Sequence, residues 1–331
     1  MSEVFAAGIG LATFNQQGDT LDCLFPKPLI QPNKEINELL KQLPQGTSTV
    51  TAEQLNKLDP TCMLAPPSVL EADCPLISVR LDEDSKIGSN PEAYLKLHLL
   101  SHRLAIPNSL NLEDIFAHLP NLAWTNKGPM DLAELNDNLI RARNSGEHIE
   151  IMGVDKFPKM VNYVVPTGVR IADASRIRLG AYLGDGTTVM HEGFVNFNAG
   201  ALGPNMVEGR ISQGVTIGEG TDLGGSASTM GTLAGGGKIV ITLGKNCLVG
   251  ANAGVGIPLG DRCTVEAGLY ITAGTVVSVV DESGEEVRKA KARELAGQSD
   301  MLFIRNSQTG QVLCRTNKRA IELNEALHSH N

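Results

Sequence analysis

The chain has 331 residues, a formal net charge of −9, and a composition that is 42% hydrophobic but only 4% aromatic. The acidic balance argues against general nucleic-acid binding, and no apolar run approaches the roughly 20 residues that are needed to span a bilayer. The first residues include Glu3 and no basic segment, so we expect no signal peptide. These features predict a soluble globular protein without nucleic-acid or membrane partners.

The cysteine pattern favours a reducing compartment. The six cysteines form no CxxC pair, and Cys247 and Cys263 stand at positions where small inward side chains are expected. We therefore expect all six thiols to be reduced in a cytoplasm.

The N-terminal part of the chain mixes the periodicities of strands and helices. The expected strands cover residues 4–13 and 76–81, and the expected helices cover residues 35–43, 91–103 and 131–144. The helix over residues 91–103 is predicted to be amphipathic. Pro158 and Pro166 mark the entry into a different pattern. We predict an N-terminal α/β domain over residues 1–150.

Between Val169 and Val280 an aliphatic residue recurs every six positions. This period fits neither a helix nor one flat strand, but it fits a coiled chain that places one aliphatic residue inward on each flat face. Small residues two positions before the next aliphatic, and Gly and Asp at the corners, support this interpretation. The aliphatic set comprises Ile171, Ile177, Leu183, Val189, Val195, Ile211, Ile217, Leu223, Leu243, Val249, Val255, Leu259, Val265, Ile271 and Val277. The pattern predicts a mainly β protein with a β-helix.

Two segments interrupt this register, residues 198–210 and 229–238. Because an insertion in a stacked coil must leave as a surface loop, we expect both segments to be loops that carry chemistry. After residue 280, a charged stretch over 281–294 precedes short apolar patterns and a terminal helix near 320–328. We predict a short C-terminal extension over residues 281–331 that leaves the coil.

The repeat region contains the motifs MHEGFVNFNAG at 190–200, MVEGR at 206–210, MGTLAGGG at 230–237 and VEAGLYITAG at 265–274. These motifs resemble those of tetrahydrodipicolinate N-succinyltransferases, most closely the longer type of actinobacteria and pseudomonads. The likeness continues through KAREL at 291–295 and FIRNS at 303–307, whereas the first 150 residues match only in length and general character.

This resemblance implies a left-handed parallel β-helix over residues 151–280, a homotrimer, and a CoA-dependent acyltransferase. The implied reaction moves a succinyl group from succinyl-CoA to the amino group of ring-opened tetrahydrodipicolinate in lysine biosynthesis. The handedness comes from the family alone, because parallel crossovers in other sheets are nearly always right-handed.

Glu208 is the candidate catalytic carboxylate. The active-site glutamate of the family falls at this place in the motif, where it would accept the proton of the amine or carry the acyl group as a mixed anhydride. From the residues alone, an exposed Glu208 paired with Arg210 is the simpler interpretation, and the resemblance reverses that preference.

The resemblance also implies a succinyl-CoA site. Arg210 would bind a carboxylate through its planar fork, Gly225 would let the CoA arm approach the backbone, and Ser228 would bind the acyl portion. Gly225 and Ser228 fit equally well as ordinary corner and small-residue positions of the repeat. Lys291 and Arg305 would supply the positive charge that CoA phosphates require. The full set expected along the CoA groove comprises Ala251, Glu266, Ala267, Gly274, Lys291, Ile304, Arg305, Asn306 and Ser307.

Glu192 is expected at a magnesium ion on the threefold axis of the implied trimer. Family members pair this residue with an acidic residue roughly one coil earlier, where this chain has Ser175, with Asp173 nearby. That departure puts the full ligand set in doubt. An ordinary surface carboxylate is the alternative interpretation of Glu192.

Other proteins built from the same repeat are the competing hypotheses. A γ-type carbonic anhydrase needs three zinc-binding histidines, whereas the repeat contains only His191. A hexapeptide acetyltransferase that uses acetyl-CoA would depend on His191 as its base, and it is the alternative function. A non-catalytic scaffold would explain the coil but not the placement of Glu208 and Arg210 in a Gly-rich break.

Overall fold

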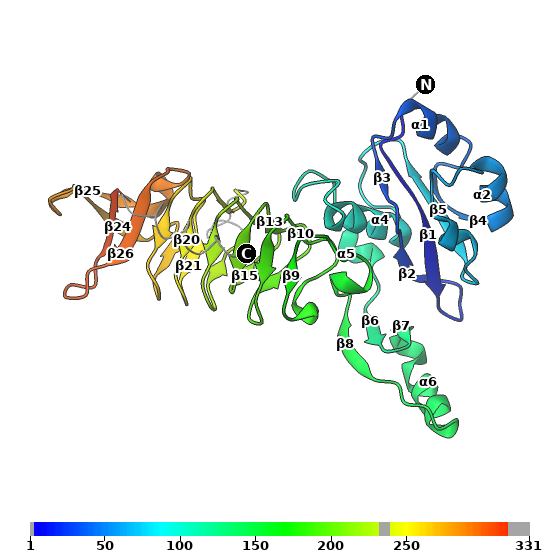
Figure 1. The fold of residues 1–331 in the computed structure, drawn as a ribbon. Coiled ribbons are helices and arrows are strands. Elements are labelled where there is room, and N and C mark those ends of the chain that lie inside the picture. Colours follow the sequence, from blue (N-terminus) through cyan, green and yellow to red (C-terminus); the bar gives the residue numbers. More distant parts are fainter. Residues whose placement is uncertain (1–2, 232–238, 317–331) are drawn as a thin grey trace. The chain divides into compact units, whose positions relative to one another are not determined.

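The computed structural model describes residues 3–231 and 239–316 (Figure 1). It separates into two compact units, Met1–Val165 and Pro166–Asn331. The helix predicted near residues 320–328 lies outside the described residues. Within the described ranges, no helix has the length and apolar character needed to cross a membrane.

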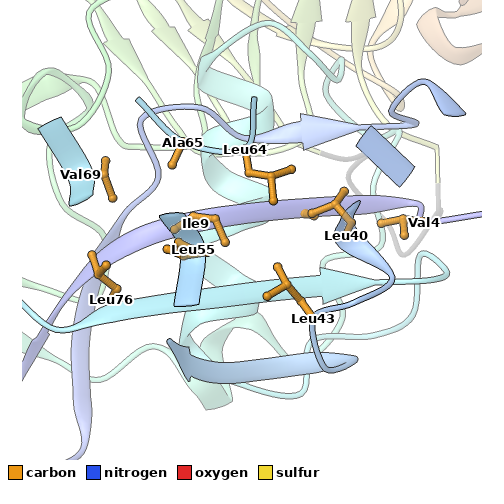
Figure 2. Close-up of a cluster of buried hydrophobic side chains, with 10 residues drawn as sticks. Val4, Ile9, Leu40, Leu43, Leu55, Leu64, Ala65, Val69 and Leu76 are labelled. Atoms are coloured by element: carbon orange, nitrogen blue, oxygen red, sulfur yellow. The ribbon is translucent and has the colours of Figure 1, made fainter. Parts of the chain in front are cut away.

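The first unit is built on an antiparallel sheet with the strand order β2-β1-β5-β4. Its strands are β1 (Ala6–Phe14), β2 (Thr20–Leu24), β4 (Gly46–Val50) and β5 (Leu76–Leu81), with the short β3 (Leu29–Ile30) paired to β1. Helices α1 (Lys34–Leu40), α2 (Ala52–Leu58) and α3 (Pro67–Leu70) contribute apolar side chains to a core that also contains Ile9 of β1 (Figure 2). The strands predicted at 4–13 and 76–81 and the helix at 35–43 are confirmed.

Helix α4 (Asn90–Ser101) contacts β2 and β5 and is buried on nearly every side. Its position confirms the prediction, but its predicted amphipathic character is wrong. Polar residues are tolerated in this helix because they have partners. Lys96 Nζ donates to Asp84 Oδ1 at 2.7 Å, and His98 Nε2 accepts a hydrogen bond from the backbone N–H of Phe25 at 3.2 Å.

A second, three-stranded sheet of this unit has the order β7-β6-β8 and is followed into the coil by a short 3₁₀ turn. Its strands are β6 (Leu122–Thr125), β7 (Gly128–Asp131) and β8 (Ile151–Asp155), and the other helices of the unit are α5 (Ile115–His118) and α6 (Leu132–Asn144). The helix predicted over 131–144 is thus confirmed. Strand β8 belongs to the first unit because it pairs with β6. The first unit therefore ends at Val165 and not at residue 150.

The second unit is a coil of short parallel strands that form three sheets. The β9 sheet contains β9 (Arg170–Ile171), β11 (Thr187–Val189), β14 (Asn205–Val207), β17 (Asp222–Leu223), β20 (Leu248–Val249) and β22 (Thr264–Val265). The β12 sheet contains β12 (Phe194–Val195), β15 (Arg210–Ile211), β18 (Ser228–Thr229), β21 (Gly254–Gly256) and β23 (Tyr270–Thr272). The β10 sheet contains β10 (Tyr182–Leu183), β13 (Gly200–Ala201), β16 (Thr216–Ile217) and β19 (Thr242–Leu243).

The aliphatic residues of the six-residue period point into the coil. Val195, Ile211 and Leu223 have no exposed surface, and the small residues Cys247 and Cys263 are equally buried. Each inward aliphatic side chain contributes about 1.5–3 kcal/mol when it is removed from water. The predicted parallel β-helix is confirmed.

The predicted loop over residues 198–210 is wrong. This segment forms β13, β14 and the start of β15, and Ala201 and Val207 continue the inward register with no exposed surface. Only the step from Val207 to Ile211 departs from the period, because it takes four positions and not six. Of the second predicted loop, residues 232–238 lie outside the described residues.

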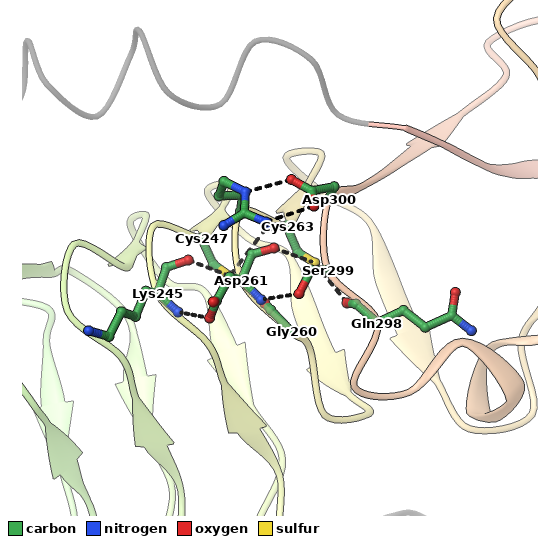
Figure 3. Close-up of polar contacts among 9 residues, drawn as sticks. Lys245, Cys247, Gly260, Asp261, Cys263, Gln298, Ser299 and Asp300 are labelled. Atoms are coloured by element: carbon green, nitrogen blue, oxygen red, sulfur yellow. Dashed lines mark hydrogen bonds and ion pairs between the residues drawn. The ribbon is translucent and has the colours of Figure 1, made fainter.

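The C-terminal extension returns to the coil instead of only leaving it. A hairpin of β24 (Val276–Val280) and β25 (Glu286–Lys291) is followed by β26 (Met301–Arg305) and β27 (Val312–Thr316). Strand β26 pairs in parallel with β22 and so continues the β9 sheet. Figure 3 shows the stacking just before β26, where the backbone N–H of Asp261 donates to Ser299 Oγ at 3.0 Å and Arg262 donates twice to Asp300. Residues 298–305 therefore cover the last turn.

Complete burial in α4 lowers the pKa of His98 to about 3. A histidine in the unfolded chain titrates near pH 6.5, so below that pH the unfolded state binds a proton that the folded state does not. We expect His98 to lower the free energy of unfolding by up to about 1.4 kcal/mol per pH unit as the pH falls from roughly 6.5 towards 3. Urea unfolding followed by the fluorescence of Trp124, the single tryptophan of the chain, measures this in the first unit.

The control for this measurement is His98→Gln, which has no titrating group. The free energy of unfolding of the wild type, relative to that of this variant, should decrease as the pH falls from 7 to 4. A stability difference between the two proteins that stays constant over this range would contradict the prediction.

Candidate active site

One row of outward residues crosses successive turns of the coil on the β12 sheet. The pairs Phe194–Arg210 and Arg210–Ser228, with a bridge between the residues that follow Arg176 and Phe194, place Arg176, Phe194, Arg210 and Ser228 in this row. Side chains alternate across a strand, and the inward neighbours of these residues are buried. Adjacent turns lie about 4.8 Å apart, so Arg176, Phe194 and Arg210 form a continuous strip of surface, whereas Ser228 is buried.

The corner between β14 and β15 is shorter than the corners above and below it. It consists of two residues, Glu208 and Gly209, whereas residues 190–193 and 224–227 form the neighbouring corners. Glycine is needed here because a Cβ on Gly209 would lie 2.4 Å from the carbonyl oxygen of Ala227. A short corner between two longer ones leaves a hollow of about 280 Å³ in the surface of the coil.

The hollow is bordered by the outward row and by the two longer corners. Its lining residues are Arg176, His191, Glu192, Phe194, Gly209, Arg210, Ser226 and Ala227. Ser226 Oγ donates a hydrogen bond of 2.8 Å to Glu192 Oε2, which links the two long corners. Two arginines face a single lining carboxylate, so the hollow suits an anionic ligand.

Glu208 is held at the edge of this hollow by its backbone. Its N–H donates to the carbonyl oxygen of Leu223 at 2.9 Å, and its own carbonyl accepts from the N–H of Ser226 at 3.3 Å. A Cβ placed on Gly225 would lie 3.7 Å from Glu208 Oε2 and 3.8 Å from Glu192 Oε2. The structure thus brings Glu208, Gly225 and Glu192 together, and the bare Gly225 leaves space beside both carboxylates.

Arg210 is oriented by Ser228 and not by Glu208. Its Nε donates to Ser228 Oγ at 3.0 Å, and it forms no ion pair with Glu208 in the described part of the chain. The alternative prediction of a salt bridge between Glu208 and Arg210 is therefore wrong. The remaining N–H groups of the Arg210 fork stay available to a ligand.

Most residues predicted along the CoA groove lie at the same corner of the coil as Glu208, in successive turns. We call this series of stacked corners the corner column. Ala251 follows β20, Glu266 and Ala267 follow β22, and β26 stacks next to them through the pair Val265–Phe303. Glu266 Oε2 accepts a hydrogen bond of 2.7 Å from the backbone N–H of Arg305. The residues at the end of this column are Ile304, Arg305, Asn306 and Ser307. These residues and Ala251, Glu266 and Ala267 therefore lie in one line along the coil, with Arg305 as the single cation among them.

Gly274 and Lys291 lie outside this column. Gly274 stands in the exposed turn between β23 and β24, and Lys291 pairs with Val276 at the start of β24. The two are close to each other at the end of the coil. The structure therefore groups the predicted CoA residues into two clusters and not into one.

The predicted metal ligands do not complete a metal site within one chain. Asp173 Oδ1 accepts hydrogen bonds from the N–H and Oγ of Ser175 at 2.9 and 2.6 Å, and these bonds lower the pKa of Asp173. The Glu192 carboxylate is bonded to Ser226. Among the described residues, no group of three or more His, Cys, Asp or Glu could hold a metal ion.

Sequence reasoning missed Arg176 and Ser226. Arg176 could have been found, because it stands one position before an inward aliphatic residue, like Phe194 and Arg210. Ser226 could not, because its contact with Glu192 joins two turns that are separated by the short corner. No periodic pattern reports such a contact.

Comparison with known families finds two matching family models. Residues 119–159 match the middle segment of tetrahydrodipicolinate N-succinyltransferase, and residues 240–273 match the hexapeptide repeat of succinyl-transferase.

Known proteins resemble this chain over almost its entire length. The 2,3,4,5-tetrahydropyridine-2,6-dicarboxylate N-succinyltransferase of Pseudomonas putida is 54% identical and that of Vibrio cholerae 51% identical, each with 99% of both chains covered. A crystal structure from Campylobacter jejuni, described as a 2,3,4,5-tetrahydropyridine-2-carboxylate N-succinyltransferase, superimposes with a TM-score of 0.86 at 32% identity. That superposition covers 97% of this chain and 94% of the other.

Proposed function

The chain belongs to the tetrahydrodipicolinate N-succinyltransferase family, and we propose that it transfers a succinyl group from succinyl-CoA to the amino group of ring-opened tetrahydrodipicolinate. This is the succinylase step of lysine and diaminopimelate biosynthesis. The observation that carries the proposal is the full-length similarity to N-succinyltransferases. The enzyme uses succinyl-CoA as co-substrate, and the coil supplies its acyltransferase domain. Its six free cysteines suit the reducing cytoplasm, where we place it.

Glu208 acts on the amine in this proposal. Two carboxylates border the space beside Gly225, but among the residues that the structure describes only that of Glu192 accepts a side-chain hydrogen bond, from Ser226. Glu208 is therefore the carboxylate that can take up a proton from the attacking amine as nitrogen bonds to the thioester carbon and the C–S bond breaks. The departing CoA sulfur then leaves as a thiolate and is protonated. Glu208 is equally placed to carry the acyl group first as a mixed anhydride.

Arg210 and Ser228 hold the acyl end of the donor. The Arg210 fork is oriented by its 3.0 Å hydrogen bond to Ser228 Oγ, which leaves donors for the succinyl carboxylate. The pantetheine arm follows the exposed corner column at Ala251 and Ala267 towards Arg305. Lys291 and Arg305 provide positive charge for the CoA phosphates on an acidic chain.

A thiol-release assay with succinyl-CoA or acetyl-CoA and either tetrahydrodipicolinate or 2-aminopimelate tests the function. We expect thiol release with succinyl-CoA and either acceptor, and we expect Glu208→Gln to lower kcat by about 100- to 10,000-fold. The variant should keep its affinity for CoA, because glutamine has the same size as glutamate and residue 208 is not part of the inward core.

Two outcomes of this assay would contradict the assignment. Wild-type turnover in Glu208→Gln would remove Glu208 from the mechanism. Preferred use of acetyl-CoA, together with loss of activity in His191→Ala and not in Glu208→Gln, would favour an acetyltransferase with His191 as its base.

We expect the enzyme to be a homotrimer in which the active site lies between neighbouring coils. The hollow and the corner column are open along the surface of a single coil, so a second surface is needed to enclose a substrate as long as succinyl-CoA. Light scattering should report three times the chain mass for the active species. An active monomer would contradict this prediction.

Magnesium at the threefold axis would be held by Glu192 from three chains, with Ser175 beside it. No group of three or more His, Cys, Asp or Glu forms within the described part of one chain, so the ion would depend on assembly and would neutralise the charge of the three carboxylates. We expect magnesium to raise the melting temperature of the wild type by a few degrees relative to chelator, and Glu192→Gln not to respond. Equal responses of the two proteins would mean that Glu192 is only a surface carboxylate.

A further inference from the structure

Arg176 is a lining residue of the hollow to which neither the proposed donor site nor the proposed metal site assigns a role. It is half-buried and stands in the outward row with Phe194 and Arg210, one turn before the first and two turns before the second. All three side chains line the same hollow.

The guanidinium of Arg176 is fixed by two backbone carbonyls. Its Nε donates to Gly193 at 3.1 Å and its Nη2 donates to Glu192 at 2.9 Å. These bonds occupy one edge of the planar fork. No residue in the part of the chain that the structure describes forms an ion pair with Arg176, and the Asp173 carboxylate acts on it only through space. A held cation with unused N–H donors in a hollow is a binding site for a carboxylate.

Phe194 separates the two arginines. Its ring is half-buried and borders the hollow between Arg176 and Arg210. The row thus presents a cation, an apolar ring and a second cation in successive turns. A ligand that matches this order has an anionic group, a methylene chain and a polar end.

A seven-carbon acceptor is long enough to extend from the turn of Glu208 and Arg210 towards the side chain of Arg176. Arg176 and Arg210 are two turns apart, or about 9.6 Å along the coil. The carboxyl carbons of an extended seven-carbon diacid lie about 7.5 Å apart, given C–C bonds of about 1.5 Å. An acceptor of this length that places its amine near Glu208, beside the turn of Arg210, directs its far end to Arg176.

We propose that Arg176 binds the acceptor carboxylate that lies farther from the reacting amine, with the methylene chain against Phe194. Arg176 is then the residue that selects acceptors with a carboxylate at both ends. This inference rests on the proposed function, because it assumes an amine acceptor that reacts beside Glu208.

The test compares two acceptors of equal length, 2-aminopimelate with two carboxylates and 2-aminoheptanoate with one. Each is assayed with succinyl-CoA against the wild type, Arg176→Gln and Arg178→Gln. Arg178 is a matched control, because it belongs to the same turn and its Nη1 donates to Asn196 Oδ1 at 3.1 Å, away from the lining of the hollow.

We expect Arg176→Gln to raise the KM for 2-aminopimelate by about 10- to 100-fold, the usual effect of losing one charged hydrogen-bonded pair. Its kcat/KM for 2-aminoheptanoate and its KM for succinyl-CoA should stay at wild-type values. Arg178→Gln should behave as the wild type with both acceptors, and all three proteins should show the same assembly in light scattering.

Two results would overturn the inference while the proposed function stands. One is an unchanged KM for 2-aminopimelate in Arg176→Gln. The other is an equal loss with both acceptors, which would mean that Arg176 only supports the corner at residues 190–193. Absence of succinyl transfer by the wild type would instead overturn the proposed function, and the inference with it.

Discussion

Parallel stacking of turns at about 4.8 Å is the constraint on which the rest of the coil depends. Each turn must return the chain to the same three faces, so the inward positions are filled by aliphatic and small residues with no exposed surface, such as Val207 and Ile211. The corners are not under this constraint, because they lie outside the core. The candidate functional groups of the coil are concentrated at these corners and on the outward row.

The short corner at Glu208 and Gly209 shows how this arrangement produces a site. Removing two residues from one corner, relative to its neighbours, leaves the inward register of Val207 and Ile211 intact. The missing backbone becomes the hollow, and its walls are the two longer corners. Two backbone hydrogen bonds to the following turn, with Leu223 and Ser226, then fix the backbone of Glu208 without help from its side chain. The scaffold thereby fixes the backbone that carries the carboxylate, which we propose as the proton acceptor.

The sequence was sufficient for the parts of the fold that repeat, because a six-residue period leaves a signal at each turn. The sequence-based prediction failed where the inward position of the period is occupied by a small residue. Ala201 holds an inward position that we assigned to a loop, since only larger aliphatic residues had been counted. It failed again for α4, where burial of Lys96 and His98 depends on partners from distant segments that no helical pattern can report.

The candidate site shows the same division. Glu208, Arg210, Gly225 and Ser228 were recognised from motifs, and the structure places them in one region. The hydrogen bond between Ser226 and Glu192, which distinguishes the two carboxylates beside Gly225, arises only when three turns are stacked. A motif thus indicates candidate acids, but only the stacked structure shows which of them, among the described residues, accepts a side-chain hydrogen bond. Since corner length can change without disturbing the core, the same coil can present a different pair of acids or cations when one corner gains or loses residues.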